Sequence, residues 1–252
     1  MKIDTNGLSS DYLLNLTGAG IADKRWTTSR KKVLIDSRVN SNKLLLKGLK
    51  QKGITVTSFT CASAIGFYGD RADELLDESS QPGEGFLAKC CELWEQSADL
   101  LTAFSDKTSK VRIGLVLSSM DGALPKMLMT NKVGVLSYFG SGKQYYPWIH
   151  IDDLCRIIVE SLTNESFAGV INGVNPEPIT NQELMIQIKN ELDLKSVILP
   201  APAFGLRIAL GEMADVVLNS NRVIPKFLLD NNFEFKFNHV GKAVKDLLER
   251  NI

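Results

Sequence analysis

Three short stretches of this chain carry residue types that could bind or transform a ligand. They are residues 15–20 (NLTGAG), 61–70 (CASAIGFYGD) and 112–117 (RIGLVL). Glycine turns let a ligand approach the backbone closely, and the hydroxyl groups of Ser63 and Tyr68 are candidates for proton transfer. Taken singly, each stretch also fits an ordinary tight turn, strand end or packed loop.

The elements that must position these stretches alternate between strand and helix. The predicted strands are residues 12–16, 55–61, 111–117, 148–151 and 169–173, and the predicted helices are 27–52, 86–104, 123–132, 152–162 and 181–192. This alternation is typical of a doubly wound parallel sheet, in which ligands lie at the carboxyl ends of the strands. The fold class is therefore α/β, with all three stretches at that edge.

The pattern changes from Pro200 onward. Three helices are predicted here, at residues 202–218, 223–229 and 240–248. Between the last two, Phe233, Phe235 and Phe237 alternate like a strand with one buried face. We expect a smaller, mixed and mostly helical domain in this region.

Composition excludes several classes of protein. Lys plus Arg and Asp plus Glu balance at 29 each over 252 residues, which gives no indication of a nucleic-acid partner. The four cysteines form no CxxC pair and only two histidines are present, so a structural zinc site is not expected. No apolar run reaches the roughly 20 residues of a membrane span, and no signal peptide is recognisable. These features predict a cytoplasmic protein with no metal, membrane or nucleic-acid partner.

Two further strings make the pattern specific. Residues 140–154 read GSGKQYYPWIHIDDL, and residues 21–26 (IADKRW) are followed by 36–39 (DSRV). With the stretches above, they resemble the extended and atypical branch of the short-chain dehydrogenase/reductase superfamily. The whole chain resembles its "epimerase family protein" group, which ends in a C-terminal domain of unknown function.

The resemblance implies a division into two domains. Residues 1–174 would form a partial, N-terminally truncated Rossmann-like NAD(P)-binding domain, with substrate-domain insertions near 118–147. Residues 175–252 would form the substrate-side domain, with the family tail from about residue 200. Strings 210–214 (LGEMA) and 222–226 (RVIPK) match that tail.

The resemblance also implies NADP(H) as cofactor. Family members hold its pyrophosphate on a GxTGxxG loop that precedes the point where this sequence starts, so whether this chain itself binds the cofactor is left open. The expected cofactor contacts here are Thr17, Gly18, Ala19, Arg38 and Ser63, on the ribose–nicotinamide side. Gene truncation, a mispredicted start codon and a genuinely shortened protein are the alternatives for the missing loop.

The expected catalytic residues depart from the superfamily's pattern of a Ser with Tyr-x-x-x-Lys. Ser63 occupies the Ser position, whereas Phe86 and Cys90 stand at the Tyr and Lys positions, with Lys89 one residue out of register. Phe cannot transfer a proton, so Ser63 and Tyr68 become the catalytic candidates. A pocket-lining role without proton transfer is the alternative for Tyr68.

The substrate pocket is expected at Tyr68, Trp148 and His150. Trp148 is alternatively a core residue, and His150 a structural hinge between strand and helix. Nucleotide-sugar enzymes of this branch carry an Arg where this chain has Tyr146 and Pro147. That difference argues against a nucleotide-sugar substrate.

Two functions follow. The first is an epimerase-like NADP(H)-binding oxidoreductase that acts on an unknown small molecule. The second is a non-catalytic dinucleotide-binding or regulatory protein, and a Tyr68→Phe change is expected to separate the two by abolishing activity only in the first. A third possibility is a pseudo-domain that binds no cofactor at all, with a homo-oligomer that covers its open sheet edge.

Overall fold

The computed structural model describes residues 10–120 and 122–250. Four strands form the main sheet in the order β1-β2-β4-β8, and every neighbouring pair is parallel. Their bounds are β1 (Tyr12–Asn15), β2 (Val56–Ala64), β4 (Ser105–Ile113) and β8 (Gly169–Gly173). The predicted parallel α/β sheet is confirmed.

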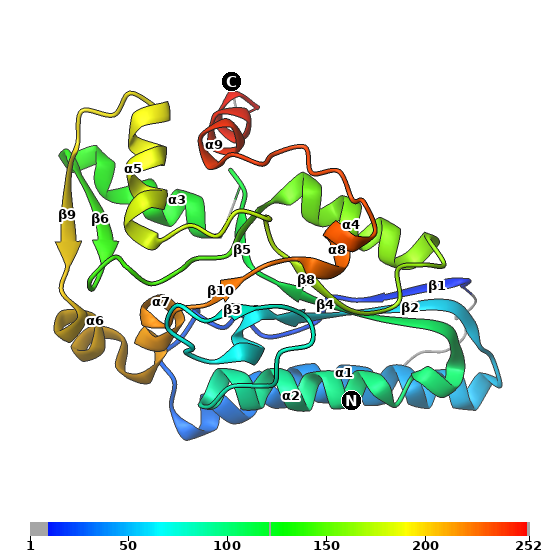
Figure 1. Ribbon diagram of the computed structural model, residues 1–252. Coiled ribbons are helices and arrows are strands. Elements are labelled where there is room, and N and C mark those ends of the chain that lie inside the picture. Colours follow the sequence, from blue (N-terminus) through cyan, green and yellow to red (C-terminus); the bar gives the residue numbers. More distant parts are fainter. Residues whose placement is uncertain (1–9, 121, 251–252) are drawn as a thin grey trace.

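Helices cover both faces of this sheet (Figure 1). On one face lie α1 (Thr28–Lys52) and α2 (Phe86–Asp99), and on the other lie α4 (Ile151–Thr163) and the short α8 (Lys226–Asp230). Six consecutive residues near the middle of β2, 58–63, are buried, as expected for a strand covered on both faces. One core cluster joins Leu49, Phe59 and Trp94 under α1 and α2. A second joins Val111, Ile157 and Ile171 under α4.

The helix ends follow local sequence signals. Thr27 caps α1 by accepting a hydrogen bond from the Arg30 N–H, and Gly53 ends the helix with a φ of 63°. Thr180 and Glu183 form a reciprocal capping box at α5 (Asn181–Glu191). The caps predicted from the sequence at Gly53 and Thr180 are confirmed.

Three two-stranded parallel sheets surround the main one. They pair β5 (Leu115–Leu117) with β7 (Trp148–His150), β6 (Val135–Phe139) with β9 (Val197–Ala201), and β3 (Leu75–Leu76) with β10 (Arg222–Val223). The remaining helical elements are η1 (Ile65–Tyr68), η2 (Thr102–Phe104), α3 (Ala123–Leu128), η3 (Met129–Val133), α6 (Ala203–Leu210), η4 (Gly211–Ala214), α7 (Asp215–Leu218) and α9 (Val240–Glu249). The helix expected over 202–218 is therefore broken at Gly211, whose φ is 62°.

A third core cluster joins the segment after β4 to the C-terminal part of the chain. Leu117, Leu136 and Trp148 pack in it with Leu184 of α5 and Val244 of α9. This cluster fixes the position of the 140–150 loop against the main sheet.

The strand expected at Phe233, Phe235 and Phe237 is absent from the described residues, and the backbone there runs as an irregular segment. Its backbone N–H groups donate hydrogen bonds to a carboxylate and not to a neighbouring strand. The N–H groups of Lys236 and Phe237 both donate to the buried Asp153 carboxylate at 3.0 Å. Phe233 and Phe235 pack on the α4 side of the core, and Phe237 packs on the cluster that contains residues of α5 and α9.

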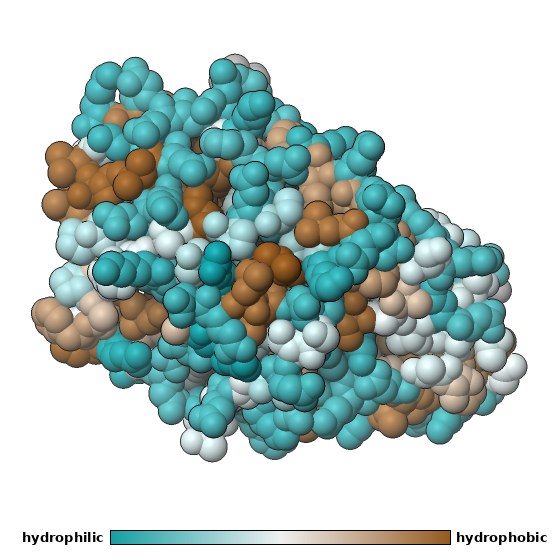
Figure 2. Space-filling model, in the orientation of Figure 1, coloured by the Kyte–Doolittle hydropathy of each residue, from teal (hydrophilic) through white to brown (hydrophobic). Residues whose placement is uncertain are grey.

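The surface drawn in Figure 2 is mainly hydrophilic, with apolar side chains gathered at the edge formed by β6, β9 and α6. Among residues 10–120 and 122–250, no helix combines the length and the apolarity needed to cross a membrane.

Candidate functional site

A cavity of about 300 Å³ opens at the carboxyl ends of β2 and β4. The turn after β1, helices α1 and α2, the 145–147 loop and the 215–221 segment close around it. Most lining side chains are apolar, among them Ile65, Leu87, Trp94 and Ile113. This volume and lining are typical of a small-molecule site.

Helix α2 presents one face to this cavity. Leu87, Cys90, Cys91 and Trp94 line it, whereas Phe86 faces away and packs edge-on against the Trp26 ring at 4.9 Å. The cavity lining therefore includes Cys90, at the expected Lys position, but not Phe86, at the expected Tyr position, and Leu87 and Cys91 form a second inward pair at i, i+4 spacing. This inward face could have been recognised in the sequence, because positions 87, 91 and 94 share one helix face.

Neither inward residue can replace a Tyr–Lys pair. Leu87 has no proton to transfer. Burial raises the pKa of the Cys91 thiol to about 12, so Cys91 is neutral near pH 7. Burial likewise raises the pKa of Cys90.

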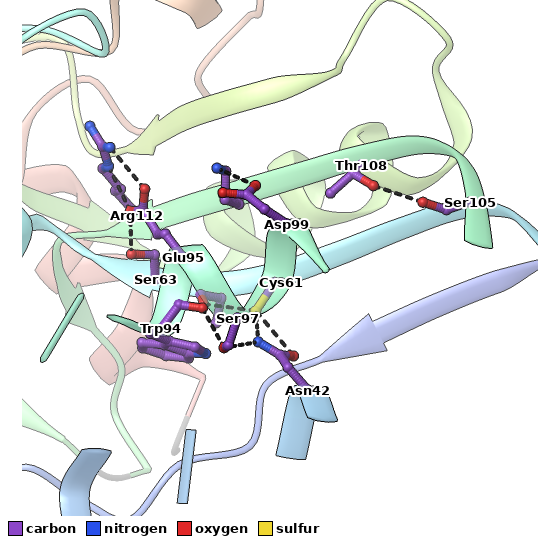
Figure 3. A network of polar contacts seen from close by, with 12 residues as sticks. Asn42, Cys61, Ser63, Trp94, Glu95, Ser97, Asp99, Ser105, Thr108 and Arg112 are labelled. Atoms are coloured by element: carbon purple, nitrogen blue, oxygen red, sulfur yellow. Dashed lines mark hydrogen bonds and ion pairs between the residues drawn. The ribbon is translucent and has the colours of Figure 1, made fainter. Parts of the chain in front are cut away.

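Beside the cavity lies a buried ion pair (Figure 3). The Arg112 guanidinium donates two hydrogen bonds to the Glu95 carboxylate, at 2.8 and 2.9 Å, and both side chains are at least nine-tenths buried. Burial opposes the charge of Arg112, but Glu95 and Tyr68 outweigh this effect and raise its pKa. The Ser63 hydroxyl donates to the same carboxylate at 2.6 Å.

Tyr68 completes this network from η1. Its hydroxyl accepts a hydrogen bond from Arg112 at 2.9 Å and donates toward the side-chain oxygen of Asn172 at 2.7 Å and the carbonyl of Asp77 at 3.0 Å. The side chain is 0% exposed, and burial raises its pKa to about 12.

The geometry thus ties Ser63 and Tyr68 into the fold. Neither residue lines the cavity, and both hydroxyls already have protein partners. Proton transfer by Ser63 or Tyr68 stays a prediction, and Tyr68→Phe alone does not separate an enzyme from a binding protein, because the change also removes hydrogen bonds that hold the fold. Glu95 and Asn172 escaped sequence reasoning, and Arg112 was noted only as the start of the 112–117 stretch, because the hydrogen bonds of this network join positions 17 to 104 residues apart.

The turn after β1 reaches the cavity through Ile21, and residues 17–19 of the same turn do not line it. Thr17 and Gly18 are exposed and Ala19 is half-buried. Asn15 holds the start of this turn, since its side-chain oxygen accepts from the Thr17 N–H at 3.0 Å and its amide donates to Asn42 of α1 at 2.5 Å.

Arg38 reaches this turn from α1 and lines the cavity. Its Nη1 donates to the carbonyl oxygens of Ala19 at 3.1 Å and Leu34 at 3.0 Å. The guanidinium lies 4.8 Å from the centroid of the Trp94 ring. The structure therefore brings Thr17, Gly18, Ala19 and Arg38 together, while Ser63 sits behind the cavity wall.

Trp148 and His150 lie in the core and not in the cavity. Trp148 is 1% exposed within the cluster shared with α5 and α9. His150 caps α4 through Nδ1, which accepts from the Asp152 N–H at 3.1 Å, and its ring stacks on Phe237 at 3.8 Å. The placement of His150 matches the hinge interpretation, and neither residue lines the cavity.

Two polar groups in the cavity were not selected from the sequence. Tyr145 and Asn219 are half-buried lining residues, and within the described part of the chain neither side-chain polar group has a hydrogen-bond partner. The Arg222 guanidinium lies 5.2 Å from the Tyr145 ring centroid. These groups are free to contact a ligand.

The site fits the nicotinamide–ribose half of a dinucleotide. The exposed turn at 17–19 offers backbone groups, and the apolar cavity beside it can take a flat ring. Within residues 10–120 and 122–250, no three His, Cys, Asp or Glu side chains are grouped so that they could hold a metal ion.

Comparison with known proteins identifies similar chains. A family model described as "Domain of unknown function (DUF1731)" matches residues 201–247. The chain is 35% identical to "Epimerase family protein SDR39U1 homolog, chloroplastic" of Arabidopsis thaliana, over 95% of this chain and 69% of that protein. It is 31% identical to an epimerase family protein of Mycobacterium leprae, over 96% of this chain and 79% of that protein.

Two solved structures are similar to this chain. The crystal structure of human epimerase family protein SDR39U1 (isoform2) with NADPH superposes with a TM-score of 0.90 at 28% identity, over 97% of this chain and 84% of that chain. A nucleoside-diphosphate sugar epimerase from Corynebacterium glutamicum gives a TM-score of 0.72 at 29% identity, over 94% of this chain and 46% of that chain.

Proposed function

Because the chain belongs to the epimerase family group of atypical short-chain dehydrogenases/reductases, we propose that it binds NADP(H) and reduces or epimerises a small, largely apolar molecule. The observation that carries this proposal is the apolar cavity enclosed by Ile21 and Arg38, by the inward face of α2 and by the 215–221 segment. The human structure with NADPH, similar over 97% of this chain, supports the choice of cofactor.

Each side of the cavity has a part in this proposal. The turn at Thr17, Gly18 and Ala19 holds the ribose next to the nicotinamide, and the α2 face at Leu87 and Trp94 excludes water from the ring. The bound cofactor supplies or accepts a hydride. Tyr145 and Asn219 orient the substrate through polar groups that have no partner in the described structure.

A second candidate, a non-catalytic dinucleotide-binding or regulatory protein, is favoured by one observation. The inward face of α2 carries Leu87 and Cys91, with the Cys91 pKa raised to about 12, and neither residue can move a proton near pH 7. Leu87 and Cys91 therefore cannot catalyse a reaction that needs a Tyr–Lys pair.

We test the proposal by calorimetric titration of the 252-residue chain with NADPH and with NADH. Saturable binding that favours NADPH supports it, and no heat of binding with either cofactor contradicts it. Binding is then followed by incubation of the chain with NADPH tritiated at the nicotinamide C4 and a panel of apolar ketones and aldehydes. Transfer of tritium to a product indicates an enzyme, and tight binding without transfer indicates the second candidate.

The surroundings of the protein belong to the same proposal. All four cysteines are free thiols, and three are buried. We propose a reducing, cytoplasmic setting, a small-molecule partner, and no nucleic-acid or membrane partner; the homo-oligomer stays a prediction.

A further inference from the structure

Arg38 is built into the cavity wall more rigidly than a surface arginine. Its Nη1 is fixed by the carbonyl oxygens of Ala19 and Leu34, at 3.1 and 3.0 Å. One face of the guanidinium is covered by the Trp94 ring, 4.8 Å away. On another side it lies against Gly18, where a side-chain Cβ would come within 3.0 Å of its Cζ. These contacts come from β1's turn, α1 and α2, so three elements hold the group in place.

The charge of Arg38 has no counter-ion. Among residues 10–120 and 122–250, no carboxylate lies within 4.0 Å of its guanidinium. Two carboxylates of neighbouring segments pair elsewhere: Asp215, which also lines the cavity, bonds Arg207 at 3.2 Å, and Asp23 approaches Arg30 at 3.6 Å. Nε and Nη2 of Arg38 likewise have no hydrogen-bond acceptor within these residues. The free donors therefore remain available at the edge of an apolar space.

From this geometry we propose that Arg38 is the specificity residue of the cavity and binds a carboxylate carried by an apolar, ring-sized ligand. A half-buried guanidinium with two free N–H donors matches the fork of a carboxylate. The apolar walls at Ile65, Leu87 and Ile113 accept the body of the same molecule. This inference rests on the proposed function only in that the ligand is the substrate; the carboxylate contact itself does not depend on NADP(H).

Arg30 provides a matched control on the same helix. Its Nη2 donates to the carbonyl of Gly20 at 2.6 Å, so it also holds the turn after β1. It does not line the cavity. Loss of either arginine removes one contact to the turn, but only loss of Arg38 removes a charge from the cavity.

The test uses phenylacetate, 2-naphthoate and octanoate as probes, with phenylacetamide and phenethylamine as neutral and cationic counterparts. Binding to the full chain is followed by Trp fluorescence and by calorimetry, without cofactor and with saturating NADPH. We expect at least one carboxylate to bind at least tenfold more tightly than phenylacetamide, and phenethylamine to bind most weakly. Arg38→Met should weaken carboxylate binding at least tenfold, Arg38→Lys less, and Arg30→Met less than threefold.

The NADPH titration of the same variants separates the two proposals. Arg38→Met should change the dissociation constant of NADPH less than threefold. Equal binding of phenylacetate and phenylacetamide, or no saturable binding of any carboxylate at millimolar concentration, overturns the inference, and both measurements need only the wild-type chain. An equal loss of NADPH and carboxylate binding in Arg38→Met also overturns it, because Arg38 would then be a cofactor residue. Failure of the wild-type chain to bind NADPH contradicts the proposed function and not the carboxylate site.

Discussion

Replacement of Glu95 by alanine is expected to destabilise the fold more than any change on the exposed side of the same helix. Arg112 would then keep its charge in a buried position, 4% exposed, without the carboxylate that accepts two of its hydrogen bonds. Ser63 would lose its acceptor as well. Arg112 also donates a hydrogen bond to the Tyr68 hydroxyl. The loss of Glu95 would therefore also affect the segment that carries Tyr68.

The magnitude follows from the burial of the pair. Removal of one partner of a buried ion pair costs about 3–5 kcal/mol, a large part of the roughly 5–15 kcal/mol that stabilises a domain. Replacement of both partners by apolar residues, Glu95→Leu with Arg112→Met, removes the unpaired charge. It leaves only the hydroxyls of Ser63 and Tyr68 short of partners, at about 1–3 kcal/mol. The double variant should therefore be more stable than Glu95→Ala.

Urea unfolding followed by circular dichroism measures this difference. Glu95→Ala should lower the midpoint by about 1–2 M, for a slope near 3 kcal/mol per M. Glu92→Ala is the control, because Glu92 pairs with Lys89 on the exposed face of α2 and its loss should cost less than about 1 kcal/mol. A Glu95→Ala midpoint equal to that of Glu92→Ala, or a double variant less stable than Glu95→Ala, would refute the reasoning.

Three further outcomes are expected. Tyr68→Phe should lower the free energy of unfolding in urea by about 1–3 kcal/mol, because the hydrogen-bond partners of this buried hydroxyl are left unsatisfied. The same change should alter NADPH affinity less than threefold, and a tenfold weaker affinity would show that Tyr68 belongs to the binding site. Burial lowers the pKa of His150, so the unfolded chain binds more protons below about pH 6.5 and stability should fall as the pH drops from 7 to 5. His150→Asn, which retains a capping side chain, should show a smaller fall in the same urea series, and an equal fall would exclude His150 as the cause. Gly18→Ala places a methyl group 3.0 Å from the Arg38 Cζ and should weaken phenylacetate binding about tenfold, or 1.4 kcal/mol, whereas unchanged binding would show that the guanidinium can move without loss.

The fold was largely predictable because its signals are local. Alternating strands and helices, the cap at Gly53 and the capping box at Thr180 are each set by a few neighbouring residues. The segment around Phe235 was predicted wrongly as a strand, because apolar alternation does not reveal whether a neighbouring strand exists. There, a carboxylate from α4, Asp153, satisfies the backbone N–H groups instead.

The site was only partly predictable. The sequence placed Arg38 on the helix that follows the turn after the first strand, and in the structure Arg38 lines the cavity and holds that turn at Ala19. The hydrogen bonds that tie Ser63 to Glu95 and Tyr68 to Asn172 were not predictable, because these partners are remote in sequence and a single chain does not reveal such pairs. On α2, Leu87, Cys90 and Cys91 line the cavity whereas Phe86 does not, since consecutive helical positions differ by about 100° in direction.

The central claim is that NADP(H) binds in the cavity beside Trp94. We would titrate the wild-type chain with NADPH and follow tryptophan fluorescence, together with Trp94→Phe and Trp148→Phe. Trp94 lines the cavity, whereas Trp148 lies in the core cluster with α5 and α9. The account predicts saturable quenching at micromolar NADPH that is largely lost in Trp94→Phe and kept in Trp148→Phe. Absence of saturable quenching in the wild-type chain, or quenching that survives in Trp94→Phe, would contradict it.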